Sequence, residues 1–246
     1  NNNNNNMAAD SSTPLGLKVV LLSDTHGKNP DIPDADMLLH AGDFTHFGKE
    51  KDFDAFAEWI DKQPHPLKVV VNGNHENNAF RDKQKGKKMI EPKGAHFLIN
   101  EGIVVDVELL KKKKEGTSTE DPVVFKIPAP KSSQPFSFPP EVDFNNKIVI
   151  YGIDFYWNCP DGNPYHDVVP PNSSIILCHN PPKGLADSNG GCPSVRAMVD
   201  RIKPKLFVCG HIHGAHAVLK GEGELEGVTV VNAAMCNEGY THKWPV

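Results

Sequence analysis

The sequence contains few cysteines, and they are widely spaced. The five cysteines are an odd number, and no two of them form a Cys-x-x-Cys pair. Disulfide frameworks and structural zinc ribbons use closely spaced pairs, so this pattern argues against both. We therefore expect reduced thiols and a cytoplasmic protein. The residues are Cys159, Cys178, Cys192, Cys209 and Cys236.

Long apolar runs and an excess of positive charge are also absent. No stretch approaches the roughly 18 apolar residues of a membrane span, and no basic-then-apolar signal segment opens the sequence, so we expect no membrane contact. Lys and Arg number 26 against 31 Asp and Glu, a net charge of −5, which gives no support to binding of duplex nucleic acid. Neither the apolar runs nor the net charge predicts an oligomeric state.

The apolar content is sufficient for a sizeable core. Hydrophobic residues make up 38% of the 246 positions, and 20 glycines add to them, which brings the total close to the usual globular range of roughly 45–50%. Collagen-like, coiled-coil and fully disordered chains are excluded. We expect one domain over residues 15–246. The asparagine tract at 1–6 leads us to expect that residues 1–14 are a disordered or artificial leader.

Short apolar runs alternate with helical patterns along the chain. Continuous runs of this length are typical of strands buried on both faces. Apolar residues spaced i, i+3, i+4, i+7 predict helices over 53–60 and over 195–202, the second followed by Pro204. Strands that alternate with helices indicate an α/β fold. The apolar runs are 19–22, 37–39, 69–71, 148–151, 175–177, 206–208 and 228–231.

One stretch, about 110–146, breaks this alternation. It contains a run of four lysines at 111–114, a polar segment and six prolines. We expect a long loop, which is either functional or mobile, with a possible edge strand over Val123–Ile127. The basic run is interpreted as solvated, with a nucleic-acid or phospholipid contact as the alternative.

Polar side chains follow five of the apolar runs. In open α/β sheets, sites form outside the carboxyl ends of the strands, so five distant segments can converge on one cleft. If the segments are extended, residues two apart point the same way, which would turn both Asp24 with His26 and His211 with His213 to one side. Glycines at 42, 73 and 210 would let the backbone turn sharply. The segments are SDTH at 23–26, GD at 42–43, GNHE at 73–76, CHN at 178–180 and GHIH at 210–213.

These side chains are of the kinds that bind metal ions. Asp, His and Asn without Cys suit divalent ions such as Mn, Fe, Zn or Mg. Two aspartates, one asparagine and four histidines are too many for one tetrahedral ion, but they suit two adjacent ions that share a carboxylate. The two carboxylates offset only part of the four positive charges of two divalent ions, so the centre would attract a negatively charged phosphate. The candidate ligands are Asp24, His26, Asp43, Asn74, His179, His211 and His213.

In this order, the motifs resemble those of the calcineurin-like metallophosphoesterase superfamily, and most closely its MPPED-type metallophosphodiesterases. The resemblance covers residues 18–235 and is carried by SDTHG at 23–27, LLHAGDFT at 38–45, VNGNHE at 71–76 and RIKPKLFVCGHIH at 201–213. It implies a four-layer α/β/β/α sandwich with two mixed sheets. The lysine- and proline-rich stretch at 110–146 departs from the family pattern.

The resemblance also implies a role for each candidate residue. His75 matches the general acid, which lies beside the metals without binding them. Some relatives lack the first histidine of GHxH, and its presence as His211 favours a competent two-metal centre. The ligands implied for the first ion are Asp24, His26 and His213, those for the second are Asn74, His179 and His211, and Asp43 bridges both.

The function implied is that of a dinuclear metal-dependent phosphodiesterase. It would hydrolyse small phosphodiesters, with cyclic nucleotides as one candidate class, through a metal-bridged hydroxide. We expect manganese, with iron, zinc or magnesium as alternatives. A phosphomonoesterase or protein phosphatase on the same fold is a second reading, but protein phosphatases carry an arginine before GNHE and a GDxVDRG motif, where this chain has VNGNHE and AGDFTHFG. A non-catalytic scaffold is a third.

Several neighbours of the motifs have less specific roles. His40 is expected to pack in the core, and Glu76 to orient its neighbours rather than to bind metal. His46 could support the site, touch substrate or lie on the surface. The aromatic run at 155–157 could stack on a base or pack in the core, and the sequence does not decide between these.

Overall fold

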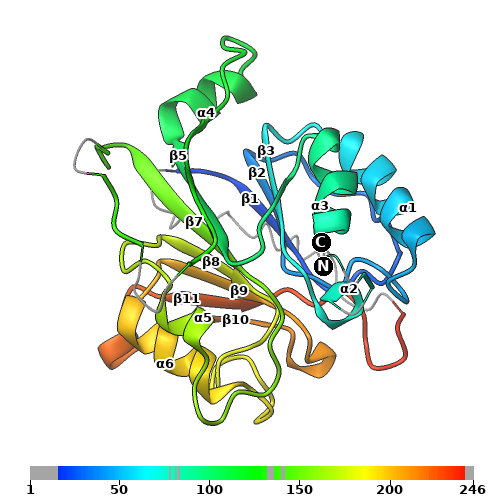
Figure 1. Ribbon diagram of the computed structural model, residues 1–246, viewed down its shortest axis with the longest axis vertical. Coiled ribbons are helices and arrows are strands. Elements are labelled where there is room, and N and C mark those ends of the chain that lie inside the picture. The colour runs from blue at the N-terminus through cyan, green and yellow to red at the C-terminus, as the bar shows by residue number, and fades with distance from the viewer. Residues whose placement is uncertain are drawn as a thin grey trace, which may run out of the picture.

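The computed structural model describes residues 16–241, apart from 78, 81, 83, 132–135 and 140–141. The leader expected at 1–14 lies outside the described residues. Two β-sheets lie face to face, and helices cover their outer faces (Figure 1). Among the described helices, none has the length and apolar composition needed to cross a lipid bilayer.

The smaller sheet has the strand order β1-β2-β3-β4, and its described strand pairs are all parallel. We expected both sheets to be mixed, so this part of the prediction is wrong. The strands are parallel because the chain returns across the sheet after each strand before the next one begins, as parallel pairing requires. The strands are β1 (Val19–Leu22), β2 (Met37–His40), β3 (Leu67–Val70) and β4 (His96–Phe97), and the helices between them are α1 (Glu50–Asp61), α2 (Asn74–Asn77) and α3 (Gln84–Ile90).

The larger sheet is mixed, as predicted, with the strand order β10-β11-β9-β8-β7-β5-β6. Parallel pairing joins β7, β8, β9 and β11, and antiparallel pairing adds β5, β6 and β10. The strands are β5 (Glu101–Asp106), β6 (Val123–Ile127), β7 (Lys147–Ile153), β8 (Ile175–Cys178), β9 (Leu206–Cys209), β10 (Ala217–Lys220) and β11 (Thr229–Asn232), and the helices are α4 (Val107–Lys114), α5 (Pro164–Asp167) and α6 (Pro193–Ile202). Short 3-10 helices lie at Glu91–Lys93, His213–Ala215 and Gly223–Leu225.

Buried apolar side chains fill the space between the layers. Leu39 and Val69 of the smaller sheet pack with Ile150 and Leu177 of the larger one. Successive side chains of a strand point to opposite faces, so Leu38 turns outward, toward helix α1. Burial on both faces explains why these strands read as continuous apolar runs.

The outer faces are covered by amphipathic helices, as the i, i+3, i+4, i+7 spacing predicts. Phe53 and Phe56 of α1 pack with Leu38 on one side of the sandwich. Val199 of α6 packs with Ile176 on the other. These contacts confirm the predicted four-layer α/β/β/α sandwich.

The stretch at 110–146 is more ordered at its start than we expected. The lysines at 111–114 form the last turn of α4 rather than a loop. This helix begins because the Asp106 carboxylate accepts hydrogen bonds from the backbone N–H groups of Glu108 and Leu109, both at 3.0 Å. Cations at a helix C-terminus are stabilised by its dipole. The predicted edge strand over Val123–Ile127 is confirmed as β6, at one end of the larger sheet.

The two sheets are linked at one edge of the sandwich, just beyond β1 and β11. The N–H of Ser23 donates to the carbonyl of Ala233 at 3.0 Å, and the N–H of Met235 donates to the carbonyl of Ser23 at 2.9 Å. This link holds the carboxyl ends of strands from both sheets side by side, and the polar motifs follow those ends.

Candidate metal centre

The predicted site residues lie together at the carboxyl ends of five strands. Three of these strands belong to the smaller sheet and two to the larger one. The centre is therefore assembled where the two sheets meet. Asp24 and His26 follow β1, Asp43 follows β2, Asn74 and His75 follow β3, His179 follows β8, and His211 and His213 follow β9.

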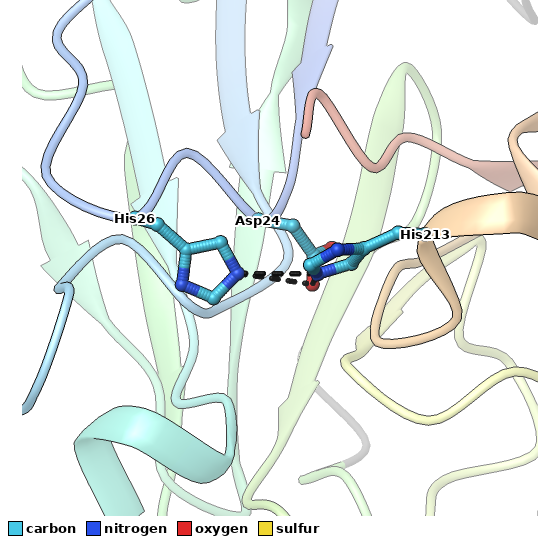
Figure 2. Close-up of side chains that lie close together, drawn as sticks. All are labelled: Asp24, His26 and His213. Carbon is cyan, nitrogen blue, oxygen red and sulfur yellow. Dashed lines mark hydrogen bonds and ion pairs between the residues drawn. The ribbon is translucent and has the colours of Figure 1, made fainter. Parts of the chain in front are cut away.

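One half of the centre consists of Asp24, His26 and His213, all buried. The rings of His26 and His213 point toward one another beside the Asp24 carboxylate (Figure 2). His213 Nε2 lies 3.1 Å from His26 Nε2 and 3.1 Å from Asp24 Oδ1. His213 Nδ1 donates to the carbonyl of Asn237 at 2.9 Å, so Nε2 is the nitrogen directed inward. Atoms with lone pairs gathered this closely require a proton or a metal cation among them.

The other half is built around His179 and Asp43. His179 Nδ1 donates to the carbonyl of Ala41 at 2.8 Å, which leaves Nε2 3.3 Å from Asp43 Oδ2 and 3.8 Å from Asp24 Oδ1. This buried Nε2 has no hydrogen-bond partner in the described part of the chain. Burial lowers the pKa of His179, but the carboxylates of Asp43 and Asp24 outweigh it and raise the pKa to about 9. The centre thus favours positive charge at this nitrogen.

Asn74 and His211 lie next to this second half. Asn74 Oδ1 and His211 Nδ1 are 2.9 Å apart, and the His211 ring lies 5.3 Å from that of His179, centroid to centroid. The backbone N–H of His211 donates to Asp24 Oδ2 at 3.0 Å. Burial, with the neighbouring His179, lowers the pKa of His211 to about 4. The imidazole is therefore uncharged at neutral pH and keeps a nitrogen lone pair that can bind a metal ion.

Asp43 occupies the middle of the centre. Two groups of residues with donor atoms close enough to hold one metal ion share it, namely His26 with Asp43 and His75, and Asp24 with Asp43 and His179. Its Oδ1 accepts a hydrogen bond from the backbone N–H of His75 at 2.9 Å. This position matches that expected of a bridging ligand, although its role, like those of the other site residues, stays a prediction.

The backbone reaches this arrangement through turns rather than through extended segments. Asp24, His26, Asp43 and His211 have φ angles of 54°, 45°, 54° and 66°. This left-handed region costs an ordinary residue about 1–2 kcal/mol. Asp24 and His26 do face one centre, but the extended backbone that we expected to turn Asp24 with His26, and His211 with His213, to one side is absent, so that reason is wrong. Strain at four predicted ligands is typical of a functional site held in place by its surroundings.

The three motif glycines act in two different ways. Gly42 has a φ of 99°, which fits the sharp turn we expected. Gly73 and Gly210 are needed for close approach instead. A Cβ at Gly73 would lie 2.1 Å from Asp43 Oδ1, and one at Gly210 would lie 2.0 Å from Asp24 Oδ2.

We predict that Gly73→Ala weakens metal binding by about 10- to 100-fold, the usual effect of disturbing a group that orients a ligand. The added methyl group must displace the Asp43 carboxylate. Isothermal titration with Mn²⁺ would measure the change. Gly116→Ala is the control: a Cβ at Gly116 meets nothing within 4 Å, and because Gly116, unlike Gly73, has a positive φ, this variant adds backbone strain without touching a predicted ligand. Unchanged affinity in the Gly73 variant would contradict the proposed dependence on Asp43.

Comparison with known proteins identifies the family. The family model described as "Calcineurin-like phosphoesterase" matches residues 17–215. The chain belongs to the calcineurin-like phosphoesterase family. A UPF0046 protein of Caenorhabditis elegans is 33% identical over 230 residues, which cover 91% of this chain and 71% of the relative. Human metallophosphoesterase domain-containing protein 1 is 28% identical over 251 residues, covering 94% of this chain and 70% of the relative.

A solved structure shares the fold. The crystal structure of TT1561 from Thermus thermophilus superposes with a TM-score of 0.52 at 13% identity, covering 89% of this chain and 91% of that one. Calcineurin-like phosphoesterases hydrolyse phosphoric esters and bind divalent metals in a dinuclear site. The donor set of this chain fits that chemistry, because the three groups able to hold an ion within the described part of the chain consist of His and Asp alone.

Glu76 supports the centre as the sequence led us to expect. Its carboxylate accepts hydrogen bonds from the backbone N–H groups of Asp43, Gly73 and Thr45 at 2.7, 2.8 and 2.8 Å. Burial, with the nearby charge of Asp43, raises the pKa of Glu76 to about 7. Glu76 thus ties two of the motif loops of this phosphoesterase together. His40 is fully buried, also as expected.

Sequence reasoning missed Tyr240 and the backbone role of His46. The Tyr240 ring lies 4.6 Å from that of His26 and 5.4 Å from that of His213, centroid to centroid. The carbonyl of His46 accepts a hydrogen bond from His75 Nδ1 at 2.6 Å. No residue pattern signals either contact, because one involves a loop after β11 and the other a backbone atom.

Proposed function

We propose that this chain is a dinuclear metal-dependent phosphodiesterase that hydrolyses small phosphodiesters, including cyclic nucleotides. The observation that carries the proposal is the gathering of donor groups around Asp43, which is common to two groups able to hold an ion. When bound, two divalent ions, manganese being our first choice, activate water as a nucleophile and neutralise phosphate charge. The five cysteines are all free, which supports a reducing, cytoplasmic location.

The protein's own contribution begins with placing the ligands. In this proposal Asp24, His26 and His213 hold one ion, Asn74, His179 and His211 hold the other, and Asp43 is shared. Backbone carbonyls fix His179 and His213 through Nδ1, which sets the tautomer and directs Nε2 inward. The ligands are therefore oriented before an ion or substrate arrives.

His75 is proposed as the general acid for the leaving group. Its Nδ1 donates to the carbonyl of His46, so Nε2 is the atom available to hold and pass a proton. Nε2 lies 3.9 Å from Asp43 Oδ2, and the side chain is partly exposed. Protonation of the leaving oxygen by a positioned side chain accelerates such reactions by about 10²–10⁴-fold.

We predict that the Mn²⁺-loaded protein hydrolyses bis-p-nitrophenyl phosphate in preference to p-nitrophenyl phosphate, and that a chelator abolishes both activities. Release of p-nitrophenolate measures the two rates in one assay. A preference for the monoester would replace the proposal by a phosphomonoesterase. Absence of turnover with two ions bound per chain would favour a non-catalytic scaffold.

A further inference from the structure

Two exposed aromatic side chains lie directly against the metal centre. Trp157 and Tyr240 are 43% and 41% exposed. A single exposed aromatic residue needs no explanation. These two differ, because each places its ring against a predicted metal ligand and leaves part of it open to solvent.

Trp157 belongs to the loop that leaves β7, and this loop is firmly anchored. Its neighbour Tyr156 stacks on Tyr165 with centroids 5.1 Å apart and an angle of 3° between the rings. Asn100 donates to the Tyr156 hydroxyl at 2.8 Å, and Asn180 donates to the Tyr156 carbonyl at 2.7 Å. The contacts of Tyr156 are thus with the protein itself, while the next residue, Trp157, remains exposed.

The same loop reaches the second half of the centre. The carbonyl of Phe155 accepts a hydrogen bond from Asn77 at 3.3 Å, and the Phe155 ring lies 5.3 Å from that of His211. The Trp157 ring lies closer, with its centroid 4.4 Å from that of His211 and a tilt of 58°. The indole therefore borders the half that contains Asn74, His179 and His211.

Tyr240 borders the other half. Beyond its contacts with His26 and His213, its ring lies 6.2 Å from that of His75, centroid to centroid. Lys28 donates from Nζ to the Tyr240 carbonyl, which holds this loop close to the segment after β1. Tyr240 is thus the aromatic side chain on the side of the proposed general acid.

We propose that Trp157 binds the organic group that stays on phosphorus and that Tyr240 binds the leaving group, so that the site selects diesters bearing planar aromatic groups such as nucleobases. This inference rests on the proposed function. The leaving group must lie toward His75, because that residue protonates its oxygen, and the second organic group of a diester then faces Trp157. Aromatic side chains bind flat groups by stacking.

Three esters with the same leaving group isolate the Trp157 contact. They are bis-p-nitrophenyl phosphate, methyl p-nitrophenyl phosphate and p-nitrophenyl phosphate, in which the group retained on phosphorus is an aryl, a methyl or none. We expect Trp157→Ala to raise KM for the first by roughly 5- to 100-fold and to leave KM for the other two unchanged. Trp157→Phe should keep most of the affinity. Tyr240→Ala should raise KM for all three by similar factors.

An inert pair of ligands tests the same contact without turnover. Diphenylphosphinate and dimethylphosphinate carry one negative charge, as a diester does, and have no ester bond. By calorimetry on the Mn²⁺-loaded protein, Trp157→Ala should weaken binding of the diphenyl compound alone. Equal weakening of both ligands, no weakening, or loss of bound manganese from the variant would overturn the inference.

The outcomes separate the inference from the proposed function. If the wild-type protein hydrolyses none of the esters but Trp157→Ala still loses affinity for diphenylphosphinate alone, the aromatic binding surface stands and the phosphodiesterase proposal fails. If the esters are hydrolysed and Trp157→Ala has wild-type KM for both diesters, the proposal stands and the role of Trp157 is overturned.

Discussion

Asp43→Asn is expected to lower the affinity for both metal ions by at least about 100-fold, because even residues that only orient a ligand cost 10- to 100-fold. Asp43 is shared by two groups able to hold an ion. Its Oδ2 lies 3.3 Å from His179 Nε2 and 3.9 Å from both His26 Nε2 and His75 Nε2. An amide of the same shape lacks the negative charge that draws cations to this point, so turnover should fall with metal content.

Elemental analysis of the purified variant, together with the diester assay, measures both effects. Asp54→Asn serves as the matched control, because Asp54 is an exposed residue of α1 and its loss should change neither quantity. If Asp43→Asn retained two ions per chain, Asp43 would not be the bridging ligand. Loss of one ion alone would assign it to a single metal.

His75→Ala is expected to keep both ions and to lose about 10²–10⁴ of the rate on esters with poor leaving groups. The loss should be much smaller for p-nitrophenyl esters, since p-nitrophenolate is stable enough to leave without a proton. His75 Nδ1 is held by the His46 carbonyl at 2.6 Å, so Nε2 is the atom placed to give the proton, and the variant lacks it.

Comparison of methyl phenyl phosphate with methyl p-nitrophenyl phosphate measures this dependence on the leaving group. Metal content must be measured as well, because His75 is also part of a group able to hold an ion with His26 and Asp43. A variant that lost an ion, and lost the same factor on both esters, would make His75 a ligand and not a general acid. His96→Ala, in β4 of the smaller sheet, should change neither rate.

Much of the fold could be predicted because its signals are local. A strand buried on both faces must be apolar throughout, so runs such as those that became β1 and β8 stand out. The amphipathic spacing of α1 and α6 is equally local. By contrast, β5 and β10 were not predicted, and β10 is mostly exposed, so its residues give no burial pattern. The lysine run at 111–114 was misinterpreted because the capping residue Asp106 decides its structure.

The candidate site shows the same division. Its chemical groups could be predicted, because Asp, His and Asn occur directly after strands whose carboxyl ends meet. The left-handed backbone at Asp24 and Asp43 could not be predicted, since it accompanies hydrogen bonds between two loops far apart in the sequence, from the Asp24 N–H to the Gly42 carbonyl and from the His26 N–H to the Asp43 carbonyl. Nor could the hydrogen bond that places His75, whose acceptor is a backbone carbonyl.

The sequence by itself determined the donor groups, their order along the chain and the strands that carry them. Only the tertiary structure decided that Asp43 lies between two ligand groups, and that Trp157 and Tyr240 stand beside different halves of the centre. The physical reason is separation along the sequence, because propensity and burial patterns depend only on a few neighbouring residues. Distances between side chains from five strands depend on how two sheets pack, and no local pattern encodes that packing.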